Sequence, residues 1–179
     1  MDMRELIERL TSRHKLGAPI FQRPDLTFVD LTDNDRLRAL LVELRDIEGF
    51  THLVLLTAVD WIEEGKFQLT YMLNNRAANQ TLGLRVYLER KDPVEFTSIH
   101  DIWPTAETYQ RELREMFGIN FPGSPRVMDE FILEGWTDMP PYRRDFDTLA
   151  YSQQTYRDRP GRATNDPRDH MKSKMYPEG

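Results

Sequence analysis

The chain contains no cysteine. Without thiols it can form no disulfide, hold no iron–sulfur cluster on thiolates, build no cysteine zinc site and offer no cysteine nucleophile. If the protein belongs to a redox enzyme, the electrons must therefore pass through another chain.

The sequence also lacks long apolar runs and an excess of basic residues. No stretch approaches the eighteen or so apolar residues of a membrane helix, and the start, MDMRELIERL, is unlike a signal peptide. We therefore expect a chain made and kept in the cytoplasm, with no direct membrane insertion. Residues 1–150 hold 18 Lys/Arg against 26 Asp/Glu, and residues 151–179 hold 6 against 4. This acidic body disfavours a nucleic-acid partner.

Motifs for nucleotide binding and hydrolysis are missing as well. The sequence has no G-x-x-x-x-G-K-S/T, no G-x-G-x-x-G and no G-x-S-x-G. No H-E-x-x-H occurs, and none of the four histidines lies at helical ligand spacing from another. We expect no metal, flavin or other cofactor in the isolated chain. Asp60–Trp61, at the end of a predicted strand, is interpreted as a strand-end turn with a packed indole.

Hydrophobic periodicity predicts three helices. Residues 2–14, a segment capped by Asp33 or Asn34, and residues 105–117 each place apolar side chains on one face. The second of these faces consists of Leu37, Leu40, Leu41 and Leu44, and the third of Tyr109, Leu113, Met116 and Phe117.

Four strands are predicted, at 26–31, 52–59, 66–73 and 81–88. The continuous apolar run at 52–59 is typical of a central strand, whereas 66–73 alternates. The order of elements predicts an α+β fold, with a mainly antiparallel sheet of about four strands and helices packed on one face.

The helix at 105–117 carries a carboxylate at the edge of its apolar stripe. Glu112 falls between Tyr109, Leu113 and Met116, so we expect it to be substantially buried and hydrogen-bonded. A structural carboxylate and an interface carboxylate are both consistent with this position. Four residues apart, Arg111 and Glu115 are expected to pair on the solvent side.

Beyond the domain predicted at 1–137, residues 138–179 contain five prolines and few aliphatic residues. Such a segment cannot bury a core of its own, and we expect an extended tail that lies along a partner. Its start, P-P-Y-R-R-D-F at 140–146, combines a stiff backbone with arginine and aromatic side chains, the types that anchor interfaces. We expect Arg143 and Arg144 to contact carboxylates or carbonyls on that partner.

Four blocks in order resemble one family. D-I-W-P at 101–104, R-E at 111–112, M-F-G-I at 116–119 and R-R-D-F at 143–146 are similar to motifs of the 30 kDa, or C, subunit family of NADH–quinone oxidoreductase, respiratory complex I. The resemblance covers about residues 97–148. Gln110 replaces a glutamate of the family pattern, Glu115 replaces the commoner aspartate, and Arg144 the commoner lysine.

The resemblance implies a non-redox accessory subunit of the peripheral arm, at the cytoplasmic face of the inner membrane. Its partners would be a subunit like a hydrogenase large chain, which helps to form the quinone site, and the terminal iron–sulfur subunit. NADH, FMN, iron–sulfur clusters and quinone would be in partner subunits, with no catalytic residue here. The motif and interface residues are Trp103, Pro104, Arg111, Glu112, Phe117, Gly118, Pro140, Arg143, Arg144, Asp145 and Phe146.

Three alternatives remain open. The same fold and motifs occur in energy-converting, membrane-bound nickel–iron hydrogenases. A soluble enzyme using Glu112 and His100 would predict turnover by the isolated chain, but no recognisable catalytic constellation supports it. A nucleic-acid adaptor would predict salt-sensitive binding through the tail, which the acidic body disfavours.

Overall fold

The computed structural model describes residues 2–155, 168 and 171. It divides the chain into two compact units, Met1–Arg144 and Asp145–Gly179. The two units meet after Arg144, seven residues beyond the boundary predicted after Thr137, so residues 138–144 are grouped with the first unit.

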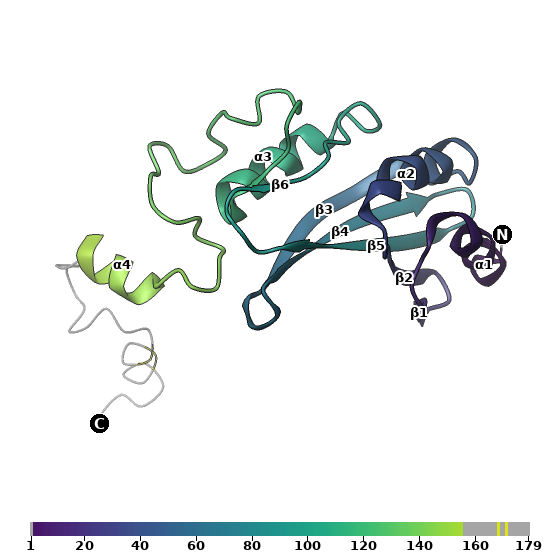
Figure 1. Ribbon diagram of the computed structural model, residues 1–179, viewed down its shortest axis with the longest axis horizontal. Coiled ribbons are helices and arrows are strands. Elements are labelled where there is room, and N and C mark those ends of the chain that lie inside the picture. Colours follow the sequence, from purple (N-terminus) through teal and green to yellow (C-terminus); the bar gives the residue numbers. More distant parts are fainter. Residues whose placement is uncertain (1, 156–167, 169–170, 172–179) are drawn as a thin grey trace. The chain divides into compact units, whose positions relative to one another are not determined.

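The first unit is built on a five-stranded sheet in the order β1-β2-β5-β4-β3 (Figure 1). Three pairings are antiparallel, and β2 runs parallel to β5. The predicted α+β class with a mainly antiparallel sheet is confirmed. The strand missing from the prediction is β1, whose four residues show no alternation in burial. The strands are β1 (Ile20–Arg23), β2 (Leu26–Asp30), β3 (His52–Trp61), β4 (Lys66–Asn75) and β5 (Gln80–Glu89).

Strand β3 is an edge strand, so its prediction as a central strand is wrong. Within the described residues it pairs only with β4. A central strand covered on both faces would bury its whole apolar run, but four of these side chains are 38–43% exposed: Val54, Leu55, Val59 and Trp61. Helix α3 satisfies part of the free edge, since the Tyr109 hydroxyl donates to the Val54 carbonyl at 2.9 Å.

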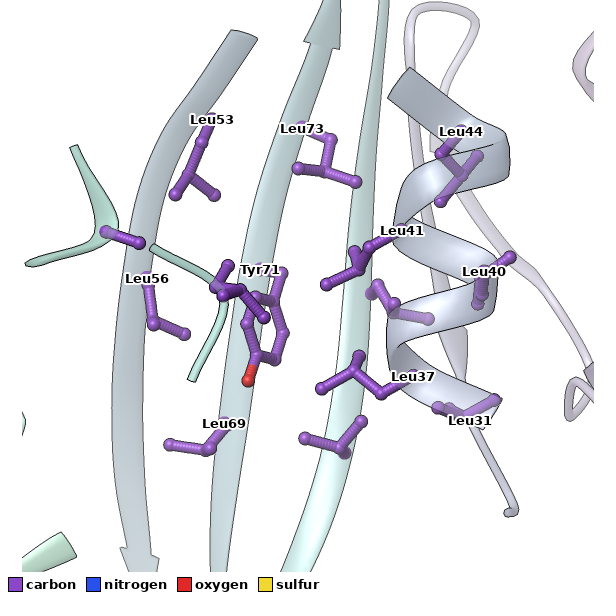
Figure 2. Close-up of a cluster of buried hydrophobic side chains, with 14 of the residues drawn as sticks. Leu31, Leu37, Leu40, Leu41, Leu44, Leu53, Leu56, Leu69, Tyr71 and Leu73 are labelled. Atoms are coloured by element: carbon purple, nitrogen blue, oxygen red, sulfur yellow. The ribbon is translucent and has the colours of Figure 1, made fainter. Parts of the chain in front are cut away.

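The core lies between the sheet and its helices. Helix α1 spans Met3–His14, α2 spans Leu37–Asp46 after the 3-10 turn η1 (Asn34–Arg36), and α3 spans Ala106–Phe117. Figure 2 shows Leu37 and Leu41 of α2 directed at the strands, with Tyr71 and Leu69 of β4 opposite. Burying each such leucine contributes about 1.5–3 kcal/mol. The leucines of α2 that are at most 1% exposed are Leu37, Leu40, Leu41 and Leu44.

A short parallel pair, β6 (Val94–Glu95) and β7 (Ile119–Asn120), joins the chain after β5 to the end of α3. In the second unit, helix α4 spans Thr148–Thr155. The segment predicted to be extended is therefore helical here. Asp147 caps the helix by accepting the amides of Leu149 and Ala150 at 3.1 and 2.9 Å. Beyond Thr155, the predicted tail lies outside the described residues, apart from residues 168 and 171.

No helix in the described ranges combines the length and the hydropathy needed to cross a bilayer.

Helices α1 and α2 are joined by polar contacts. Glu43 Oε2 lies 2.7 Å from His14 Nε2, and Glu43 Oε1 accepts from Arg13 at 2.7 Å. The hydrogen bond with His14, followed by the one from Arg13, holds the pKa of Glu43 below its ordinary value of 4.5, against an opposing effect of burial.

Acid should weaken this contact. Because the pKa of Glu43 is lower in the folded chain than in the unfolded one, its stabilising effect is complete above pH 4.5 and is lost as the pH falls through the folded value. We expect Glu43→Gln to reduce the loss of unfolding free energy between about pH 5 and 3, measured by urea titration. The other ion-paired carboxylates are present in both proteins. If unfolding free energy falls equally steeply with decreasing pH in both, Glu43 does not have this role.

Candidate partner interface

The D-I-W-P turn fixes the start of α3. Trp103 is 5% exposed, and its indole Nε1 donates to the Thr51 carbonyl at 3.0 Å. Asp101 accepts both guanidinium nitrogens of Arg38, at 3.0 and 2.5 Å. This hydrogen bonding by Arg38 lowers the pKa of Asp101 to about 2. Pro104 is exposed at the first turn. Trp103 and Asp101 therefore stabilise the turn, and Pro104 faces solvent.

Around α3, the side chains are arranged differently from the prediction. The buried polar residue is Gln110, at 0% exposure, which accepts a hydrogen bond from the Ser98 hydroxyl at 2.9 Å. Glu112 is only partly buried and makes no hydrogen bond to the described residues, so its expected burial is wrong. The buried face of α3 runs through Ala106, Gln110 and Leu113, so Glu112 lies at the edge of this face.

Arg111 and Glu115 do not form the predicted ion pair. The Arg111 guanidinium lies 5.6 Å from the centre of the Phe131 ring. Glu115 accepts three backbone amides, those of Phe131, Ile132 and Leu133, at 2.6, 2.8 and 3.1 Å. Residues 125–139, named here the acidic loop, therefore cover the side of α3 that was expected to face solvent.

Replacing Glu115 with alanine should release the acidic loop from α3. A carboxylate that accepts backbone amides contributes more than a neutral hydrogen bond, and the three amides would lose their acceptor. We expect a loss of about 1–3 kcal/mol in unfolding free energy and faster hydrogen exchange at residues 131–133. Glu112→Ala on the same helix is the matched control, with a change within about 0.5 kcal/mol. Equal effects of the two substitutions would contradict the assignment.

The end of α3 requires a glycine. Gly118 has φ +76°, and a Cβ there would lie 2.7 Å from Arg143 Nη2 and 3.2 Å from Pro140 Cγ. Next to it, the Phe117 ring meets the Tyr142 ring edge-on at 5.7 Å, and the Tyr142 amide donates to the Met116 carbonyl at 3.0 Å. Residues 140–143 therefore close over the helix end.

Arg143 is the centre of this closure. Its side chain is 9% exposed. Its Nε donates to the Phe117 carbonyl at 2.8 Å, and its two terminal nitrogens reach Asp92 at 3.0 and 2.6 Å. The guanidinium also lies 5.6 Å from the centre of the Phe67 ring. Arg143 thus contacts a carboxylate and a carbonyl of its own chain, because the planar fork fits Asp92 and the last carbonyl of α3.

Arg144 is attached mainly through its backbone. Its amide donates to Asp60 Oδ2 at 2.9 Å, and Asp60 Oδ1 accepts from Arg90 at 2.9 Å. Asp60, in the last part of β3, is 3% exposed and anchors the 140–144 segment through this hydrogen bond. The Arg144 side chain, 55% exposed, pairs with Glu63 at 3.1 Å.

Asp145 and Phe146 belong to the second unit. Phe146 is partly buried, and its ring lies 5.7 Å from that of Tyr151. Asp145 is exposed. The motif residues thus divide into four groups. They lie at the end of α3 (Phe117, Gly118, Pro140, Arg143, Arg144), at its start (Trp103, Pro104), in its middle (Arg111, Glu112) and in the second unit (Asp145, Phe146).

Chemically, this arrangement is suited to binding. In the part of the chain that the structure describes, no three His, Asp or Glu side chains gather as a metal site would require. Sequence reasoning missed Asp92, and it missed the roles of Asp60 and Glu115 as acceptors for other segments of the chain. The one available signal was the position of Asp60 at the end of a predicted strand.

Comparison with known proteins agrees with these motifs. Residues 31–152 match the model of the family described as "Respiratory-chain NADH dehydrogenase, 30 Kd subunit". The C subunit of the NADH-quinone oxidoreductase of Moorella thermoacetica is 34% identical over 117 residues, which cover 63% of this chain and 74% of that protein. The corresponding protein of Ruegeria pomeroyi is 35% identical over 122 residues, covering 66% of this chain and 58% of the relative.

A solved structure extends the likeness to most of the chain. It is a chain from the membrane-bound sulfane sulfur reductase, an archaeal respiratory membrane complex, with a TM-score of 0.76 and 25% identity. The match covers 92% of this chain and 96% of that one. Since the family model matches more than half of the sequence, the chain belongs to the 30 kDa, or C, subunit family of respiratory-chain NADH dehydrogenase.

Proposed function

We propose that this chain is a non-redox accessory subunit of the peripheral arm of a complex I-type NADH–quinone oxidoreductase. It supports the subunit that resembles a hydrogenase large chain and helps to form the quinone site. The observation that carries this proposal is the structural role of the family motifs. Trp103, Gly118 and Arg143 fix the two ends of α3 and the segments around them. They stiffen a surface and offer no reacting group.

Redox chemistry is assigned to partner chains. This sequence has no cysteine for a cluster. NADH, FMN, iron–sulfur clusters and quinone are proposed to be held by other subunits, with the terminal iron–sulfur subunit as a second partner. The purified chain should therefore carry no stoichiometric transition metal or flavin after stringent washing, as metal analysis and absorption spectra would test.

The proposed location is peripheral, on the cytoplasmic face of the inner membrane. The chain would be attached through its partner subunits, without a membrane segment of its own. Residues from Asp145 onward, which form a separate unit, are proposed to contribute to assembly by lying against a partner. Deleting them should leave the first unit folded and the peripheral arm incomplete.

A second candidate is the equivalent subunit of an energy-converting membrane-bound nickel–iron hydrogenase or a related reductase. The likeness to a chain of the sulfane sulfur reductase, over nearly the whole of both chains, favours it. The two candidates share the architecture and differ in the electron donor and acceptor of the whole complex.

Purification through an affinity tag on the full chain, in its source cells, tests both. The expected result is a membrane complex that oxidises NADH with quinone and loses this activity when the chain is deleted. Nickel in the purified complex, with hydrogen turnover and no NADH oxidation, would support the second candidate. Recovery of the chain alone would contradict both.

A further inference from the structure

The acidic loop presents apolar side chains to solvent. Met128 and Ile132 are 65% and 63% exposed, and Met139 is 42% exposed. In the same loop, Val127 is buried and Phe131 is packed against the core. The loop therefore anchors one set of residues and displays another, which is typical of an interaction surface.

This loop is held in one conformation before any partner arrives. Besides the three amides bound by Glu115, Glu130 accepts the Gly135 amide at 2.7 Å, and the Trp136 indole donates to the Met139 carbonyl at 3.1 Å. The entropy lost on docking is reduced when a loop is already ordered.

The net charge of the loop indicates the charge of the partner segment that would bind it. It carries four acidic residues against the single base Arg126, which is already paired with Glu107 at 2.7 Å. Within the described ranges, Asp129, Glu134 and Asp138 make no ion pair or side-chain hydrogen bond. Unpaired carboxylates around exposed apolar residues favour a cationic partner.

A hollow of about 310 Å³ lies between the loop and the end of α3. Three of the described residues that line it are acidic (Glu115, Glu130, Asp138), and one, Arg114, is basic. Asn120, in the same wall, donates to Glu95 at 3.0 Å. A guanidinium or ammonium group, which offers donors and no acceptor, suits a lining in which carboxylates outnumber the single base.

We infer that the acidic loop is the docking surface for a segment of a partner protein that carries an arginine or lysine beside apolar residues. The cation enters the hollow next to Trp136 and Asp138, while the apolar residues pack on Met128 and Ile132. This rests on the proposed function, in which the partner is another subunit of the same complex.

Photo-crosslinking in source cells tests the inference with the full, tagged chain. A photoreactive residue replaces Ile132 in one sample and Ile47, which is 73% exposed just after α2, in the control. We expect position 132 to cross-link to a subunit of the complex within a segment that contains Arg or Lys, and position 47 not to reach that segment. A cross-link to a segment without a base, or to a second copy of this chain, would overturn the inference.

Charge reversal supplies a second measurement. The double variant Glu134→Lys with Asp138→Lys should reduce the co-purified complex by about tenfold or more. Glu5→Lys with Glu8→Lys, the same charge change on exposed positions of α1, should leave it unchanged. Replacing the cross-linked base of the partner with Asp should restore the complex. Urea unfolding of each variant separates loss of docking from loss of folding, and if the reversal unfolds the chain, Ile132→Ser against Ile47→Ser gives the same comparison.

The outcomes for the two proposals are distinct. If the wild-type chain assembles and the 134/138 variant assembles equally well, the docking surface is wrong and the proposed function stands. If the wild-type chain co-purifies with no respiratory subunit, the proposed function fails.

Discussion

Replacing Arg143 with alanine is expected to lower the free energy of unfolding by about 2–4 kcal/mol. The substitution removes the bidentate contact with Asp92, the hydrogen bond to the Phe117 carbonyl and the cation over Phe67. It also leaves a cavity against Gly118, where the guanidinium packs. Urea unfolding followed by tryptophan fluorescence would measure the change.

Arg144 is the matched control, because it is the next residue and the same type. Its side chain is largely exposed and pairs with an exposed glutamate, a contact of about 0–1 kcal/mol. Arg144→Ala keeps the backbone amide that Asp60 accepts, so little stability should be lost. If the two alanine variants unfold at the same urea concentration, Arg143 does not stabilise the closure over α3.

Ending the chain after Thr137 should be more damaging than ending it after Arg144. The shorter chain loses the Tyr142 ring on Phe117, all the Arg143 contacts and the amide donated to Asp60. Asp60 would stay buried with one hydrogen-bond donor fewer, which is costly in a poorly hydrated site. We expect the first truncation to lose on the order of 3–5 kcal/mol, or to be insoluble.

The chain ending after Arg144 retains the whole first unit. Its unfolding should stay cooperative and close in midpoint to that of the full protein. Thermal unfolding of the three proteins would compare them directly. Equal stability of both truncated chains would restore the boundary after Thr137, with residues 138–144 as part of an assembly tail.

Elements with a strong periodic pattern could be predicted from the sequence. Strand β4 alternates apolar and polar residues, and the leucines of α2 recur at helical spacing, so both were predicted close to their observed bounds. Strand β1 was missed because its exposed residues carry no pattern. The apolar run of β3 was misplaced since a single sequence does not show which apolar residues stay uncovered.

The site was harder to predict because its bonds join distant residues. The pairs Arg143–Asp92 and Arg144–Asp60 are separated by 51 and 84 residues. Composition identified Arg143 as an anchoring residue but could not show that it binds residues of its own chain. On α3, a shift of the buried stripe to Gln110 changed the environments of Glu112 and Glu115, which helical spacing alone does not fix to within one residue.

The parallel pairing of β2 with β5 has a consequence for synthesis. Strands β3, β4 and β5 follow one another as hairpins, whereas the Asp30–Arg85 contact closes a span of 55 residues. Because closing long loops costs entropy, local hairpins form first. We therefore expect the N-terminal segment to leave the ribosome first and to complete its packing late. The leucines of α2 would stay exposed until strands β3 to β5, which follow α2 in the sequence, have been translated.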